Sequence, residues 1–113
     1  MKDYRIAVKD GVDLEPLHPI CFVALFECAR IFHMHNFTCT VTSTSEQVQS
    51  RKTNSLHYTK PYCRAFDLRI WRIPTAWLPR IVEKLQRALN IVDEHFQVVL
   101  KPDHIHIELD FRS

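Results

Sequence analysis

The chain has 113 residues, of which 46% are hydrophobic, so residues 1–113 are expected to form a single domain with one core. Its net charge of +2 is small, and its basic residues form no stripe with interleaved aromatics. These features argue against a nucleic acid as the partner.

The sequence contains no segment that we expect to cross a membrane. The best candidate, Ile20–Phe32, is interrupted by Glu27 and Arg30 and is too short to span a bilayer. Met1–Arg5 lacks the apolar stretch and cleavage site of a signal peptide, so we expect synthesis in the cytoplasm. The four cysteines form no C-x-x-C pair, which disfavours a zinc ribbon and predicts free thiols.

The first half of the chain predicts a strand, a helix and a second strand. Alternating residues at Tyr4–Val8 indicate a short strand. The segment His18–His35 has one broad apolar face and predicts the main buried helix, ending near Asn36, a residue that tolerates a left-handed cap. The β-branched run Thr38–Thr44 predicts a strand, and Ser45–Asn54 a polar loop.

The second half predicts a strand followed by a helix. Ala65–Trp71 alternates apolar and polar residues and therefore reads as a strand. Thr75–Asn90 predicts a helix that Thr75 could cap, although Pro79 favours a start a few residues later. The apolar stripe of this helix comprises Trp77, Leu78, Ile81, Leu85 and Leu89.

The end of the chain predicts an antiparallel hairpin. Its strands are Phe96–Leu100 and Ile105–Phe111, joined by a tight turn at Lys101–Asp103. Together these elements predict an α+β fold, a mostly antiparallel sheet with two helices. The order of the strands cannot be read from the sequence.

The last predicted strand carries a group of polar side chains with metal-binding chemistry. If Ile105 and Ile107 point into the core, His104, His106 and Glu108 share the opposite face, because successive strand residues alternate. Two histidines on one strand face can form a metal-ligand pair. We expect Glu108 to hydrogen-bond a ligand histidine.

Two residues earlier in the chain, together with His106, would complete a possible metal site. His57, Asp67 and His106 would supply two nitrogens and one carboxylate, which matches a catalytic zinc site that keeps one position open for water. A nearby carboxylate must then accept a proton and pass it to the leaving amine. Asp103, three residues before His106, is the candidate for that role.

Three short motifs in chain order resemble the zinc D-Ala-D-Ala carboxypeptidase family, which includes the L-alanyl-D-glutamate endopeptidases of phage lysins. They are Ser55-x-His57, Ala65-x-Asp67 and Asp103-x-x-His106. The family pattern is S-x-H-x-x-G-x-A-x-D followed by D/E-x-x-H, and His104-x-His106 is similar to the H-x-H of the wider group that includes lysostaphin-type enzymes and the hedgehog domain. The resemblance implies a hedgehog/D-Ala-D-Ala peptidase-like fold.

The resemblance also implies roles for individual residues. His57, Asp67 and His106 would bind Zn²⁺, and Asp103 would be the catalytic base. Arg51, or with less support Lys52, matches the family arginine that binds the substrate or the oxyanion. His104 would orient the substrate or stabilise the oxyanion.

The first motif departs from the family pattern in two ways. The step from His57 to Asp67 is ten residues where the family has seven, and Lys60–Cys63 stands where the family has a glycine. This is expected to be a short insertion at a surface turn, a place where chains tolerate added length. Cys63 lies close enough in sequence to offer an alternative thiolate ligand.

Two functional hypotheses follow. The first is a zinc metallopeptidase that hydrolyses peptidoglycan stem peptides, as a carboxypeptidase or an endopeptidase. Its small size and the missing signal peptide favour a phage or prophage product that reaches the cell wall after release. The alternative is a non-catalytic zinc-binding structural or binding module with the same fold. The sequence specifies neither the bond that is cut nor the oligomeric state.

Overall fold

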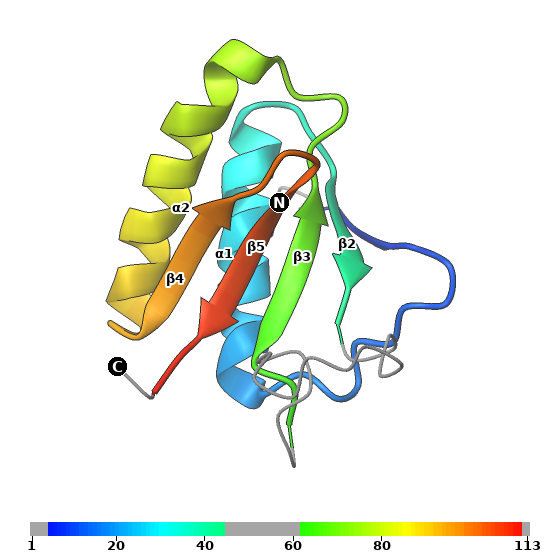
Figure 1. Ribbon diagram of the computed structural model, residues 1–113, viewed down its shortest axis with the longest axis vertical. Helices are drawn as coiled ribbons and strands as arrows, with labels where there is room; N and C mark the ends of the chain where they lie inside the picture. The colour runs from blue at the N-terminus through cyan, green and yellow to red at the C-terminus, as the bar shows by residue number, and fades with distance from the viewer. Residues whose placement is uncertain (1–4, 45–61, 112–113) are drawn as a thin grey trace.

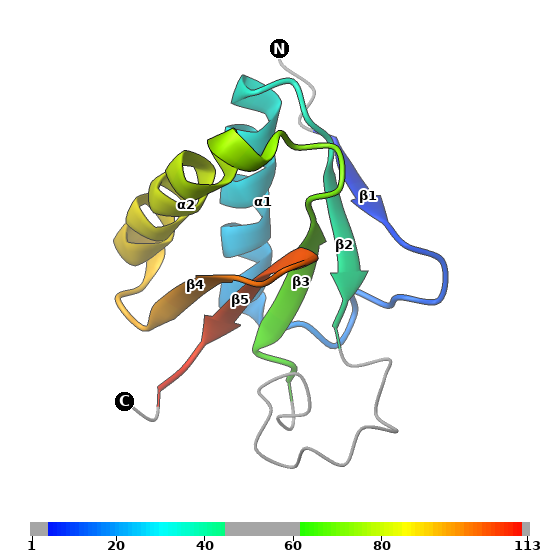
Figure 2. The same cartoon turned by 45° about the horizontal axis from the view of Figure 1, so that its top comes forward.

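The fold is built around one hydrophobic core between a five-stranded sheet and two helices (Figure 1). The computed structural model describes residues 5–44 and 62–111. Both helices lie against the same face of the sheet, and in Figure 2 the other face carries no helix. The described residues therefore form two layers, and neither of their helices covers the second face of the sheet.

The sheet is mixed, with the strand order β1-β2-β3-β5-β4. Its strands are β1 (Ile6–Val8), β2 (Cys39–Ser43), β3 (Ala65–Arg69), β4 (Phe96–Leu100) and β5 (His104–Leu109). β1 runs parallel to β2, since a helix lies between them in the chain, and the other three neighbouring pairs are antiparallel. The predicted α+β class with a mostly antiparallel sheet is confirmed.

The first helix, α1 (Pro19–Met34), begins and ends close to where the sequence predicts. His18 caps its start, because the Nδ1 atom of His18 accepts a hydrogen bond from the Ile20 backbone N–H at 3.1 Å. Asn36, just beyond its end, has a φ of 64°, the left-handed conformation expected there.

The second helix, α2 (Leu78–Val92), starts later than its apolar pattern suggests. Thr75 does not cap it: a short 3-10 turn, η2 (Thr75–Trp77), comes first, and the cap position falls on Trp77 with no side-chain hydrogen bond. Pro79 fits the first turn of an α-helix, where its missing N–H has no partner to lose. Trp77 is about half exposed at 47%, so it does not belong to the buried stripe.

The hairpin of β4 and β5 shows the predicted alternation. Ile105, Ile107 and Leu109 are fully buried, whereas the residues between them are only partly buried. The turn closes with a hydrogen bond of 2.8 Å from the Lys101 N–H to the His104 carbonyl, so β5 begins one residue earlier than predicted. His104, His106 and Glu108 therefore share the face that the helices leave open.

The two helices of the described part of the chain, α1 and α2, are both too short or too polar to cross a lipid bilayer.

Candidate metal centre

The register between β3 and β5 brings Asp67 together with two histidines. Asp67 lies directly opposite His106, and Arg69 lies opposite His104. The Nδ1 atom of His106 is 2.8 Å from the Oδ1 atom of Asp67, and the Nε2 atom of His104 is 3.7 Å from its Oδ2 atom. One ligand atom from each of Asp67, His104 and His106 lies within 4.8 Å of the other two, so the three residues could hold a metal ion.

The remaining nitrogen of each histidine contacts a second carboxylate. The Nε2 atom of His106 is 2.8 Å from the Oε1 atom of Glu108, and the Nδ1 atom of His104 is 2.6 Å from the Oδ1 atom of Asp103. Metal-binding histidines characteristically donate their second N–H to such an acceptor, which fixes the tautomer and the ring orientation. The rings are thus held with one nitrogen each toward Asp67.

Burial of the cluster decreases toward the β4–β5 turn. The side chains of Asp67 and His106 are only 14% and 15% exposed, whereas that of Asp103 is 87% exposed. The cluster opens into a depression of about 410 Å³ on the helix-free face of the sheet. Its lining includes Asp67, Asp103, His104, Arg69, Thr42 and Ser43. A ligand in this depression would therefore reach both Asp67 and the outer carboxylate.

The donor set suits a divalent metal ion, zinc among them. Two imidazoles and one carboxylate are common ligands of a catalytic Zn²⁺, at about 2.0–2.2 Å from the ion, which places tetrahedral donor atoms about 3.4 Å apart. The two contacts of Asp67 with the histidines, at 2.8 and 3.7 Å, lie on either side of that separation. Small side-chain rotations would therefore suffice to accommodate the ion.

The structure brings some of the predicted site residues together. Asp67 and His106 are adjacent, and Asp103 joins them through its contact with His104. His57 and Arg51 lie outside the described residues. Sequence reasoning assigned His104 to the substrate; the structure also places it in the metal-capable group. The H-x-H spacing on one strand face was the signal for that placement.

Two further residues considered from the sequence can be located. Glu108 makes the expected contact with a histidine of the cluster. Cys63 is buried in the hydrophobic core, and its thiol donates a hydrogen bond of 2.9 Å to the Ala65 carbonyl. Cys63 is not a member of the metal-capable group in the described part of the chain.

Comparisons of the chain with protein-family models, with curated proteins and with solved structures returned no match.

Proposed function

We propose that this protein is a zinc-dependent hydrolase of peptide bonds in the stem peptides of bacterial peptidoglycan. The observation that carries the proposal is the convergence of Asp67, His104 and His106, with each histidine held by a further carboxylate. The substrate class comes from the three motifs, which resemble those of zinc D-Ala-D-Ala carboxypeptidases and L-alanyl-D-glutamate endopeptidases.

Asp67 and His106 are common to both ligand sets under consideration. The sequence motifs combine them with His57, and the described part of the structure combines them with His104. We assign Asp67 and His106 as zinc ligands. The third ligand is either His57 or His104, and the variants below distinguish them. A zinc ion held there would polarise a peptide carbonyl and activate water near neutral pH.

The outer carboxylate suits a role in proton transfer. Asp103 lies at the mouth of the depression, and its side chain is exposed enough to meet a bound substrate. We propose that Asp103 accepts a proton from the attacking water and delivers it to the leaving amine. Its contact with His104 would orient that ring at the same time.

The test compares bound metal and activity across single variants. We expect one zinc per chain by elemental analysis, and release of soluble fragments from purified peptidoglycan. Asp67→Ala and His106→Ala should lose both zinc and activity, and only one of His57→Ala and His104→Ala should lose zinc to the same extent. His35→Asn is the matched control, because His35 contacts Lys84 and not the cluster.

The results separate the possible outcomes. A wild-type chain without bound zinc, or a His106→Ala variant as active as the wild type, would refute the proposal. Zinc binding without turnover on any wall peptide would instead identify a non-catalytic zinc module.

The role of Asp103 needs its own variant. Asp103→Asn should keep its zinc and lose about 10²–10⁴-fold in turnover, the usual contribution of a general acid–base group. Loss of zinc from this variant would show that Asp103 acts by positioning His104 rather than by moving a proton.

A further inference from the structure

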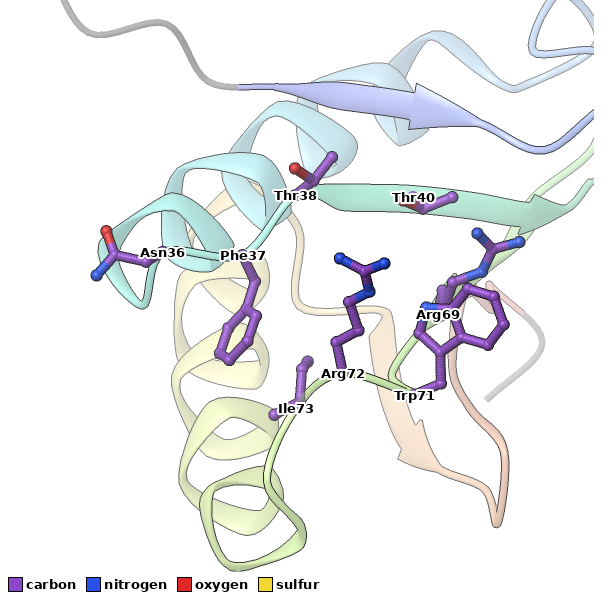
Figure 3. Close-up of a pocket in the computed structure, with 8 residues that line it drawn as sticks. All are labelled: Asn36, Phe37, Thr38, Thr40, Arg69, Trp71, Arg72 and Ile73. Carbon is purple, nitrogen blue, oxygen red and sulfur yellow. The ribbon is translucent and has the colours of Figure 1, made fainter.

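A second depression, of about 260 Å³, shares two lining residues with the first, and Figure 3 shows the residues that line it. It is enclosed by the start of β2 and by the segment that follows β3. Phe37 and Ile73 form an apolar wall at one end, and the side chains of Arg69 and Arg72 extend from the β3 side toward β2. The depression is thus apolar at one end and strongly basic at the other.

The two arginines have no acidic partner among the residues that the structure describes. No carboxylate lines the depression, and neither Arg69 nor Arg72 makes an ion pair with residues 5–44 or 62–111. The guanidinium carbon of Arg69 lies 4.5 Å from the centre of the Trp71 ring, a cation–π contact that restrains the side chain. The hydroxyl-bearing Thr38 and Thr40 also line the space. Such a set of donors is suited to an anion.

The basic depression is continuous with the cluster. Arg69 and Trp71 line both depressions, and Arg69 lies opposite His104 in the sheet. Arg69 also follows Asp67 by two residues on the same strand face, a separation of about 6.8 Å along a strand. An extended peptide with its scissile bond at Asp67 would therefore reach the arginines within about two to three residues.

We propose that Arg69 and Arg72 form a subsite that binds a carboxylate of the peptide substrate. The identity of that peptide rests on the proposed function. A stem peptide offers two sources of this group, the carboxylate at its C-terminus and the free carboxylate of its D-glutamate. A planar guanidinium group can bind either carboxylate through a pair of hydrogen bonds. The two arginines together carry more positive charge than one carboxylate neutralises. We therefore expect the subsite to bind a peptide with a free carboxylate more tightly than its amide.

The experiment measures binding of three probe peptides to the 113-residue chain by calorimetry. The probes are the stem pentapeptide L-Ala-γ-D-Glu-L-Lys-D-Ala-D-Ala, its C-terminal amide, and its analogue with D-isoglutamine in place of D-glutamate. Amidation of the recognised carboxylate should weaken binding by the wild type about tenfold, the usual scale for a charge-assisted hydrogen bond. Amidation of the other carboxylate should have little effect on affinity. The comparison therefore identifies which of the two carboxylates the subsite binds.

The variants localise the effect. Arg69→Gln and Arg72→Gln should each weaken binding of the acidic pentapeptide about tenfold. Neither change should alter binding of the probe whose recognised carboxylate is amidated. Arg87→Gln removes the same charge from the exposed face of α2, where Arg87 pairs with Glu83, and should bind all probes like the wild type. Circular dichroism of each variant checks the fold.

The inference and the proposed function can fail separately. Equal affinity of the wild type for all three probes, or losses in the arginine variants that are equal for acidic and amidated probes, would overturn the subsite. Arginine-dependent binding of the acidic probe in a protein that never hydrolyses it would keep the subsite and reject the hydrolase.

Discussion

Glu108 shows how a residue outside the ligand set can control the proposed metal site. It lies two residues beyond His106 on the same strand face, and its carboxylate contacts the nitrogen of His106 that points away from Asp67. Both nitrogens of His106 face a carboxylate at 2.8 Å, Nδ1 that of Asp67 and Nε2 that of Glu108. With a metal ion at Nδ1, Glu108 would accept the hydrogen bond from the Nε2–H. Glu108 would thereby orient the ring and hold the proton on the nitrogen that does not bind the ion.

Glu108→Gln should therefore lower zinc affinity about 10–100-fold, because an amide is a weaker acceptor that no longer raises the basicity of the ring. Competition with a chromogenic chelator at constant pH measures the change. Glu94→Gln, a change at an exposed glutamate on the α2–β4 connection, is the control and should bind zinc like the wild type. Equal zinc affinity of Glu108→Gln and wild type would contradict the role.

The residues of the cluster differ in how far the sequence could predict them. The shared face of His104, His106 and Glu108 follows from strand alternation alone, which depends only on neighbours along the chain. The contact between Asp67 and His106 depends on the register of β3 and β5, because these two residues are 39 positions apart in the chain. That register is fixed by the packing of buried side chains, so only the motif resemblance, and no local pattern, could suggest it.

At the level of elements, α2 shows how an amphipathic helix contributes to stability by burying its apolar side. Ile81, Leu85 and Leu89 are fully buried along one side of this helix, facing α1 and β4. Ile91, on the same helix, is 88% exposed. The predicted stripe was correct apart from Trp77, which lies in the 3-10 turn before the helix. Side-chain periodicity predicts the interior of a helix better than its first turn, which depends on proline and cap geometry.

Leu85→Ala should lower the free energy of unfolding by about 2–5 kcal/mol, because it leaves a cavity in a core that cannot fully close. Ile91→Ala makes a change of similar chemistry on the exposed side and should alter stability by less than about 0.5 kcal/mol. Urea unfolding followed by circular dichroism measures both. Similar losses in the two variants would show that α2 does not dock through the Leu85 face.

At the level of the whole molecule, the arrangement of layers creates the site. Both helices cover one face of the sheet (Figure 2), and the partly buried polar side chains of β3 and β5 lie on the other. The sequence predicted the strands and helices that make these layers. It could not predict that β5 inserts between β3 and β4 or that β1 pairs in parallel with β2. Such pairings are decided by contacts between distant segments rather than by local propensity.

The same two-layer packing buries all four cysteines as free thiols. Burial raises the pKa of the Cys21 and Cys39 thiols from 9.0 to about 12, and it raises the pKa of Cys28 in the same direction. The charged thiolate is disfavoured because an apolar core solvates it poorly. The thiols of Cys21, Cys28 and Cys39 should thus remain protonated in the folded protein at a pH where the same thiols of the unfolded chain are already ionised.

This difference makes stability depend on alkaline pH. Below pH 9 both states keep the Cys39 proton, whereas between pH 9 and about 12 only the folded state keeps it. The unfolded state then binds fewer protons, so the free energy of unfolding falls as pH rises, by about 1.4 kcal/mol per pH unit for each such thiol.

Cys39→Ala should be less stable than the wild type at neutral pH and should lose stability less steeply above pH 9. Urea unfolding of both proteins under reducing conditions measures the two slopes; tyrosines and lysines titrate in both, so their effect cancels in the difference. Parallel slopes would mean that Cys39 ionises equally in the folded and unfolded chains, and that the core around β2 does not exclude water.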